Sequence, residues 1–125
     1  MTDADRRLVA IRGATTTEED TPEQIQERTA SLIEAILART GIATDEIVSI
    51  IFTATPDLVS DFPAVAARGL GLSQIPLICS QELAVNDSMP RCVRVMLHAY
   101  SRLSRDEVRH VYLHDARQLR TDLPE

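Results

Sequence analysis

The side chains that could do chemistry in this sequence include an arginine on a short apolar segment. Residues 8–14, LVAIRGA, predict a β-strand, and strict alternation places Arg12 on the same face as Ala10 and Ala14. A guanidinium between two alanines lies either at the end of a sheet or beside an anion, because its fork of N–H donors matches a carboxylate or phosphate. Arg12 is therefore a candidate anion-binding residue.

Two more candidates lie near the end of another apolar segment. Residues 75–80, IPLICS, predict a strand, with Cys79 close to its end and Glu82 in the following loop. Cys79 is either a nucleophile, which needs a base nearby, or a small buried hydrophobic side chain. Glu82 is either part of a site, since loops often hold functional residues, or simply solvated. Strict alternation puts the two side chains on opposite faces, so a shared ligand requires irregular backbone at residues 80–81.

Two later residues are equally ambiguous. Residues 90–103 predict a helix whose apolar stripe excludes Arg94 and puts it on a polar face with Arg91 and His98. Such a face is ordinarily solvated. Tyr112 falls on a later predicted strand, where a hydrogen-bonded core tyrosine is the ordinary explanation. Taken one at a time, these residues identify no reaction.

The sequence lacks the motifs of several large enzyme classes. It has no GxGxxG or Walker A nucleotide motif, no GxSxG nucleophile elbow and no HExxH zinc motif. His110 and His114 share one face of a predicted strand, but two histidines without a third ligand make a weak metal site. Cys79 and Cys92 form no CxxC pair. No metal site is therefore expected.

The overall composition limits the partners. The chain contains 13 Lys+Arg, all of them arginine, against 19 Asp+Glu, and this net charge of −6 argues against nucleic acid or an anionic membrane as partner. Two Phe, two Tyr and no Trp leave no stacking platform for bases. The first residues contain no apolar run typical of a signal peptide, which predicts a cytoplasmic protein with free thiols.

The elements that must position these residues alternate along the chain. Thr21, Pro22 and Gln24 predict a helix start, and Gly41 predicts its end. The other predicted elements are a nearly continuous apolar strand over 47–54, a short helix over 61–69, a turn or capping box at 104–107, a strand over 108–113 and a short strand over 116–120. The order β-α-β-α-β-α-β predicts a mixed or parallel β-sheet with helices on one or both faces. Of these arrangements we expect an α+β fold with a mixed β-sheet and helices packed on one face. We expect one domain over 1–125, with a polar lead-in at 1–7 and a polar tail at 121–125.

Six short blocks, taken in order, resemble one protein family. They are IRGATT at 11–16, ATPDL at 54–58, FPA at 62–64, CSQE at 79–82, CVRVM at 92–96 and RHVYL at 109–113. Over roughly residues 8–123 the chain closely resembles the monofunctional trimeric chorismate mutases of the Bacillus subtilis type. The resemblance implies a homotrimer that forms a pseudo-α/β barrel, with active sites between subunits. It also implies a rearrangement of the chorismate dianion to prephenate without any cofactor.

The resemblance implies a role for individual residues. The catalytic ones would be Arg94, Glu82 and Arg12. Arg12 would bind a carboxylate, Arg94 would reach a carboxylate and the ether oxygen, and Glu82 would accept a hydrogen bond from the ring hydroxyl. Cys79 would contact the same hydroxyl, and Tyr112 would hold the enolpyruvyl carboxylate. The implied substrate-binding residues are Arg12, Phe62, Arg68, Ile78, Cys79, Ser80, Gln81, Glu82, Arg94, Tyr112, Leu119 and Arg120.

Two positions depart from the family pattern, and two other functions remain open. Val65 stands where the family can have a lysine near the ligand, and Ile78 replaces a small hydroxyl residue. A catalytically silent metabolite-binding trimer would be consistent with both departures. A trimeric enamine/imine deaminase-like protein would share the size, the order of elements and one carboxylate-binding arginine.

Overall fold

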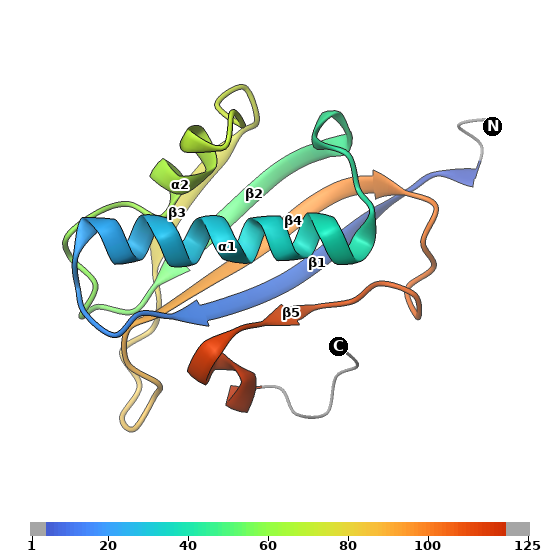
Figure 1. Cartoon of the computed structure of the whole chain (residues 1–125). Helices are drawn as coiled ribbons and strands as arrows, with labels where there is room; N and C mark the ends of the chain where they lie inside the picture. The colour runs from blue at the N-terminus through green and yellow to red at the C-terminus, as the bar shows by residue number, and fades with distance from the viewer. Residues whose placement is uncertain (1–4, 120–125) are drawn as a thin grey trace.

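Five strands form one mixed sheet in the computed structural model, which describes residues 5–119 (Figure 1). The strands are β1 (Arg7–Thr16), β2 (Ile47–Ala54), β3 (Leu77–Gln81), β4 (Cys92–Ser101) and β5 (Val111–Tyr112). Their order across the sheet is β3-β2-β4-β1-β5. β4 is antiparallel to β1 and β2, whereas β2 pairs with β3, and β1 with β5, in parallel. The predicted α+β class and mixed sheet are confirmed.

The long helix α1 (Pro22–Thr40) begins and ends where the sequence predicts. Thr21 Oγ1 accepts a hydrogen bond of 3.2 Å from the backbone N–H of Gln24, and Pro22 occupies the first turn. At the other end Gly41 has a φ of 72°, a left-handed conformation that glycine adopts without steric penalty.

Neither α1 nor any other helix in the described part of the chain is long and apolar enough to cross a bilayer.

The helices cover one face of the sheet, as predicted. Figure 1 shows α1 running across the strands, with α2 (Ala64–Gly69) beside it near β3. Leu32 and Ile36 of α1 share the main core cluster with Ile11 of β1. Gly13 permits this close approach, because a Cβ at its position would lie only 3.0 Å from Ile36 Cδ1 and 3.1 Å from Leu32 Cδ1.

The opposite face of the sheet, called the open face below, exposes apolar side chains. Residues of each long strand alternate between the helix-covered core and the open face. The exposed large apolar side chains on it are Leu8, Ile51, Ile78 and Tyr100. Arg12, Thr53 and Arg94 lie on the same face and are partly buried. An apolar surface rimmed by polar groups in this way is typical of an interaction site.

The helix predicted over 90–103 is wrong, because this segment forms β4 in the middle of the sheet. Its apolar residues match a helical stripe, but they also alternate. The buried alternating residues are Val93, Val95, Leu97 and Ala99. Hydrogen-bonded pairing with β1 on one side and β2 on the other favours the alternating pattern of a strand over the helical pattern. Arg94 therefore lies on the open face of a central strand.

Three smaller expectations are also wrong. The strand over 108–113 is reduced to the two residues of β5, and a 3₁₀ helix, His114–Leu119, replaces the short strand expected from residue 116. β3 continues regularly through Gln81 and pairs with β2 without a register shift, so the irregular backbone expected at residues 80–81 is not found.

The turn at 104–107 is confirmed. The backbone N–H of Ser104 donates a 2.9 Å hydrogen bond to Glu107 Oε1. Hydrogen bonds from the backbone and side chain of Ser104 hold the pKa of the Glu107 carboxyl below its usual value. This turn leads the chain from β4 back toward β5 at the edge of the sheet.

Candidate active site

Four of the residues singled out from the sequence line one cavity of about 210 Å³. Arg12 comes from β1, Arg94 from β4 and Tyr112 from β5, while Glu82 directly follows β3. Ile51 and other open-face residues complete the lining, so the cavity lies on the open face. Segments far apart in the sequence thus bring two guanidinium groups, one carboxylate and one phenol together.

Arg94 and Glu82 form an ion pair in this cavity. The Nε atom of Arg94 lies 3.2 Å from Oε1 of Glu82. The N–H bond is not aligned for a hydrogen bond, and this buried Nε has no hydrogen-bond partner within residues 5–119. The side chains are 42% and 26% exposed respectively, so the pair remains open to a ligand. The contact is therefore an attraction of charges that leaves hydrogen-bonding capacity on both groups.

Glu82 is also anchored to β2. Its backbone N–H donates to the carbonyl oxygen of Ala54 at 2.9 Å, which extends the parallel pairing by one residue. Thr53 Oγ1 donates to Glu82 Oε2 at 2.5 Å. The two carboxylate oxygens consequently have different neighbours, Thr53 on one and Arg94 on the other.

Arg12 is positioned through its own backbone and that of its neighbour. Its N–H donates to Nδ1 of His110 at 3.0 Å, which ties β1 to the segment before β5. The adjacent Gly13 lies under α1, so the strand is held from a second side. His110 therefore has a structural contact here, and no cluster of three or more His, Cys, Asp or Glu that could hold a metal ion occurs among residues 5–119.

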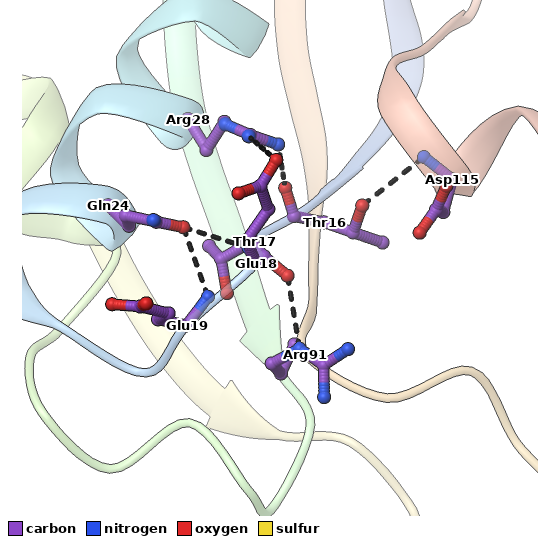
Figure 2. Close-up of polar contacts among 8 residues, drawn as sticks. All are labelled: Thr16, Thr17, Glu18, Glu19, Gln24, Arg28, Arg91 and Asp115. Atoms are coloured by element: carbon purple, nitrogen blue, oxygen red, sulfur yellow. Dashed lines mark hydrogen bonds and ion pairs between the residues drawn. The ribbon is translucent and has the colours of Figure 1, made fainter.

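Polar contacts hold the turn that leads into β4. Figure 2 shows Arg91 beside the segment after β1, where its Nε donates to the carbonyl oxygen of Thr17 at 3.1 Å. Arg91 has a left-handed φ of 48°, and its N–H donates to Asp57 Oδ2 at 2.9 Å. The expectation that Arg91 lies on a solvated helix face is therefore wrong. Arg91 directly precedes β4, so its contacts fix the direction in which the strand that contains Arg94 begins.

A buried cysteine lies beside the charged pair. Cys92 is in a small core cluster with Tyr112 and Ala14. Burial raises the pKa of the Cys92 thiol above its usual value, although the charge of nearby Arg94 opposes this shift. The thiol is therefore neutral at pH 7 and adds no second negative charge to compete for Arg94.

Four of the other predicted site residues line a second, larger cavity. This cavity has a volume of about 410 Å³ and is lined by the loop after β2 and the end of β3, including Phe62, Cys79, Ser80 and Gln81. Cys79 is partly buried and packs against the main core on the helix-covered side. Within one chain, Cys79 therefore does not share the cavity of Glu82.

Three predicted residues of the described part of the chain line neither cavity. Arg68 is exposed on α2, and Ile78 is exposed on the open face. Leu119 packs against the cluster of Cys92 and Tyr112. Arg120 lies outside the described residues.

The sequence analysis missed one residue that lines the charged cavity and one that holds the turn leading into β4. Thr53 belongs to an almost continuous apolar run, and only its position two residues after Ile51 indicates that it shares a face with that side chain. Asp57 was taken as the end of a strand, because its partner Arg91 is 34 residues away. Neither contact leaves a local signal in the sequence.

The charged cavity is suited to an anion that also has a hydroxyl group. Arginine stays charged and donates in fixed directions, so two of them bind carboxylates specifically. A carboxylate such as that of Glu82 can only accept hydrogen bonds when ionised, which suits a ligand hydroxyl. The combination favours binding and electrostatic stabilisation over attack by a protein nucleophile.

Comparison with known proteins gives one consistent answer. A family model described as chorismate mutase type I matches residues 8–123. The chain is 46% identical over 114 residues to chorismate mutase AroH of Thermus thermophilus, covering 90% of this chain and 93% of that protein. It is 41% identical over 114 residues to chorismate mutase AroH of Bacillus subtilis, covering 90% of each. A solved chorismate mutase from Clostridium thermocellum superposes with a TM-score of 0.87 at 40% identity, covering 88% of this chain and 98% of that one.

Proposed function

The chain belongs to the type I chorismate mutases, and from this membership we propose that Arg12, Glu82 and Arg94 are its catalytic residues. The protein is an isomerase that converts chorismate to prephenate, a step of aromatic amino acid biosynthesis. The deaminase-like and catalytically silent alternatives are set aside, because the family model and both curated relatives agree on one activity.

The reaction needs positioning and charge stabilisation, not a nucleophile. Chorismate rearranges by an intramolecular [3,3] shift in which a C–O bond breaks and a C–C bond forms within the same molecule. The enzyme has to hold the flexible side chain over the ring in a reactive geometry. It also has to stabilise the negative charge that develops on the ether oxygen when C–O cleavage runs ahead of C–C formation.

Arg94 is suited to the ether oxygen. Glu82 lies beside the Nε end of its guanidinium, at 3.2 Å, while the side chain remains 42% exposed in the cavity. The terminal nitrogens can then donate to a substrate carboxylate and to the ether oxygen together. A donor that is already in place costs no reorganisation when the charge develops.

The other residues hold the substrate. Arg12 binds one carboxylate and Tyr112 the enolpyruvyl carboxylate. Glu82 accepts a hydrogen bond from the ring hydroxyl and offsets part of the positive charge of the arginines. The single observation that supports this assignment best is that Arg94 and Glu82 meet in one cavity with Arg12 and Tyr112.

We propose that the working site lies between subunits of a homotrimer. The proposed ligand contacts divide between two cavities, with Arg12, Glu82 and Arg94 at one and Phe62 and Cys79 at the other. The exposed apolar side chains of the open face supply a surface on which a second copy can pack. A neighbouring subunit would then bring its Phe62 wall to the charged cavity of the first. Free Cys79 and Cys92 are consistent with the cytoplasmic location expected from the sequence.

The activity is tested by following the loss of chorismate absorbance with the purified protein. We expect a rate far above the uncatalysed one, saturation with chorismate and no requirement for added metal or cofactor. Alanine at Arg12 should raise KM, because a carboxylate contact is present in both substrate and transition state. An unchanged KM for Arg12→Ala would contradict its assigned role.

A further inference from the structure

Thr53 lies between the two charged residues of the site. On β2 it pairs with Ser80 of β3 on one side and with Arg94 of β4 on the other. Its side chain lines the charged cavity together with those of Glu82 and Arg94. Thr53 therefore lies on β2 between the end of β3, which Glu82 follows, and Arg94 on β4.

The carboxylate of Glu82 needs a constraint that its backbone alone does not provide. Glu82 follows the last residue of β3, and its backbone N–H is bonded to Ala54. Three side-chain torsions still separate that backbone from the carboxylate. Within residues 5–119, the side chain that donates a hydrogen bond to this carboxylate is Thr53, through Oγ1 to Oε2. Arg94 attracts Oε1 but does not make an aligned hydrogen bond.

We propose that Thr53 is a positioning residue that acts through Glu82. Its O–H holds Oε2, and this fixes the plane of the carboxylate with Oε1 directed at Arg94 and at the ring hydroxyl of the substrate. The carboxylate in turn keeps the guanidinium of Arg94 in place by its Nε end. This inference rests on the proposed function of Glu82 and Arg94, and adds a residue that touches neither the ether oxygen nor the carboxylates of chorismate.

The ordinary explanation of Thr53 is that a β-branched residue suits a strand. Two variants separate the explanations. Thr53→Val keeps the β-branched shape and removes the hydroxyl. Thr53→Ser keeps the hydroxyl and removes the β-branched methyl group. A structural role predicts that valine is tolerated better, whereas positioning of Glu82 predicts that serine is.

The experiment measures kcat and KM for both variants, for Glu82→Ala and for the double variant Thr53→Val with Glu82→Ala. We expect Thr53→Val to lower kcat/KM about tenfold or more, mostly through kcat, because a hydrogen bond to a charged group is lost. Thr53→Ser should stay within about threefold of wild type, since the donor is retained. In the Glu82→Ala background, Thr53→Val should have almost no further effect, because the partner is gone.

Thr44→Val is the matched control, since Thr44 is exposed and lies outside the charged cavity. It should leave kcat and KM unchanged, and thermal unfolding should show that every variant is folded. Wild-type kinetics of Thr53→Val would overturn this inference but not the proposed function of Glu82. So would a Thr53→Val effect of equal size with and without the Glu82 carboxylate. Wild-type kinetics of Glu82→Ala would overturn the proposed function of Glu82 and, with it, the inference.

Discussion

Arg94 Nε lies 3.2 Å from Glu82 Oε1, although β2 separates β4, which contains Arg94, from β3, which Glu82 directly follows. The contact is possible because Glu82 follows the end of β3, where its side chain can reach over Thr53 toward β4. The fold alone thus brings the positive and negative groups of the site together. Such a preassembled pair is the arrangement that electrostatic catalysis requires.

The proposed division of ligand contacts between two cavities predicts complementation between subunits. Arg94→Ala removes the cation from the charged cavity, and Phe62→Asp places a negative charge where the dianion must approach. Phe62 is 66% exposed, so this change should not affect folding. Each variant alone should be nearly inactive. Refolded together in equal amounts, they should regain about a quarter of wild-type activity, because random assortment makes that fraction of interface sites free of both changes.

Sedimentation supplies the independent check of this arrangement. The wild-type protein and both variants should sediment as trimers at assay concentrations. A mixture of the variants that forms hybrid trimers but gains no activity would contradict a site shared between subunits. A stable monomer with full activity would contradict it as well.

Cys79 is expected to bind the ring hydroxyl and not to act as a nucleophile. Its side chain is partly buried and packs against the core beside the second cavity. Cys79→Ser should therefore keep kcat/KM within about tenfold of wild type, because serine retains a donor and acceptor of similar size. A folded Cys79→Ser protein without activity, measured in the chorismate absorbance assay, is the result that would show this role to be wrong.

Cys92 predicts a specific dependence of stability on pH. Burial raises the pKa of its thiol in the folded protein, so the thiol ionises more readily in the unfolded chain. The free energy of unfolding should therefore decrease as the pH rises above about 9, the ordinary range for a thiol. Cys92→Ala should cost about 1 kcal/mol at pH 7 through lost packing. Its unfolding free energy should then decrease less steeply between pH 8 and 10.5.

The measurement is chemical denaturation across this pH range at one fixed protein concentration, because assembly would also contribute to stability. Arg39→Lys, an exposed change in the last turn of α1, serves as the control and should follow wild type. Equal slopes for wild type and Cys92→Ala would show that the thiol is not responsible.

Local signals were reliable where one short segment decides the structure. The cap at Thr21 and the left-handed Gly41 define α1 without help from the rest of the chain. Alternation was also sufficient for Arg12, which lies on the open face as its neighbours Ala10 and Ala14 predict. In both cases the pattern had one interpretation.

The sequence alone did not predict the structure where a helical and an alternating pattern fitted the same residues. In β4 the helical and the alternating interpretation both contain Val95 and Ala99, and long-range pairing with β1 and β2 selects the strand. The position of Arg94 beside Glu82 follows from that pairing. The side-chain contacts of Thr53 and Asp57 also join residues 29 and 34 positions apart, which no local pattern encodes.

The role of Arg94 is tested most directly by the kinetics of Arg94→Lys. Lysine keeps the charge but loses the planar fork, so it cannot face Glu82, a carboxylate and the ether oxygen together. Because the charge on that oxygen develops mainly in the transition state, kcat should decrease by at least about 10²–10³-fold, with a smaller rise in KM. Arg102→Lys is the matched control on an exposed arginine outside the charged cavity, and it should be silent. A folded Arg94→Lys protein with wild-type kcat would contradict electrostatic stabilisation of the ether oxygen by Arg94.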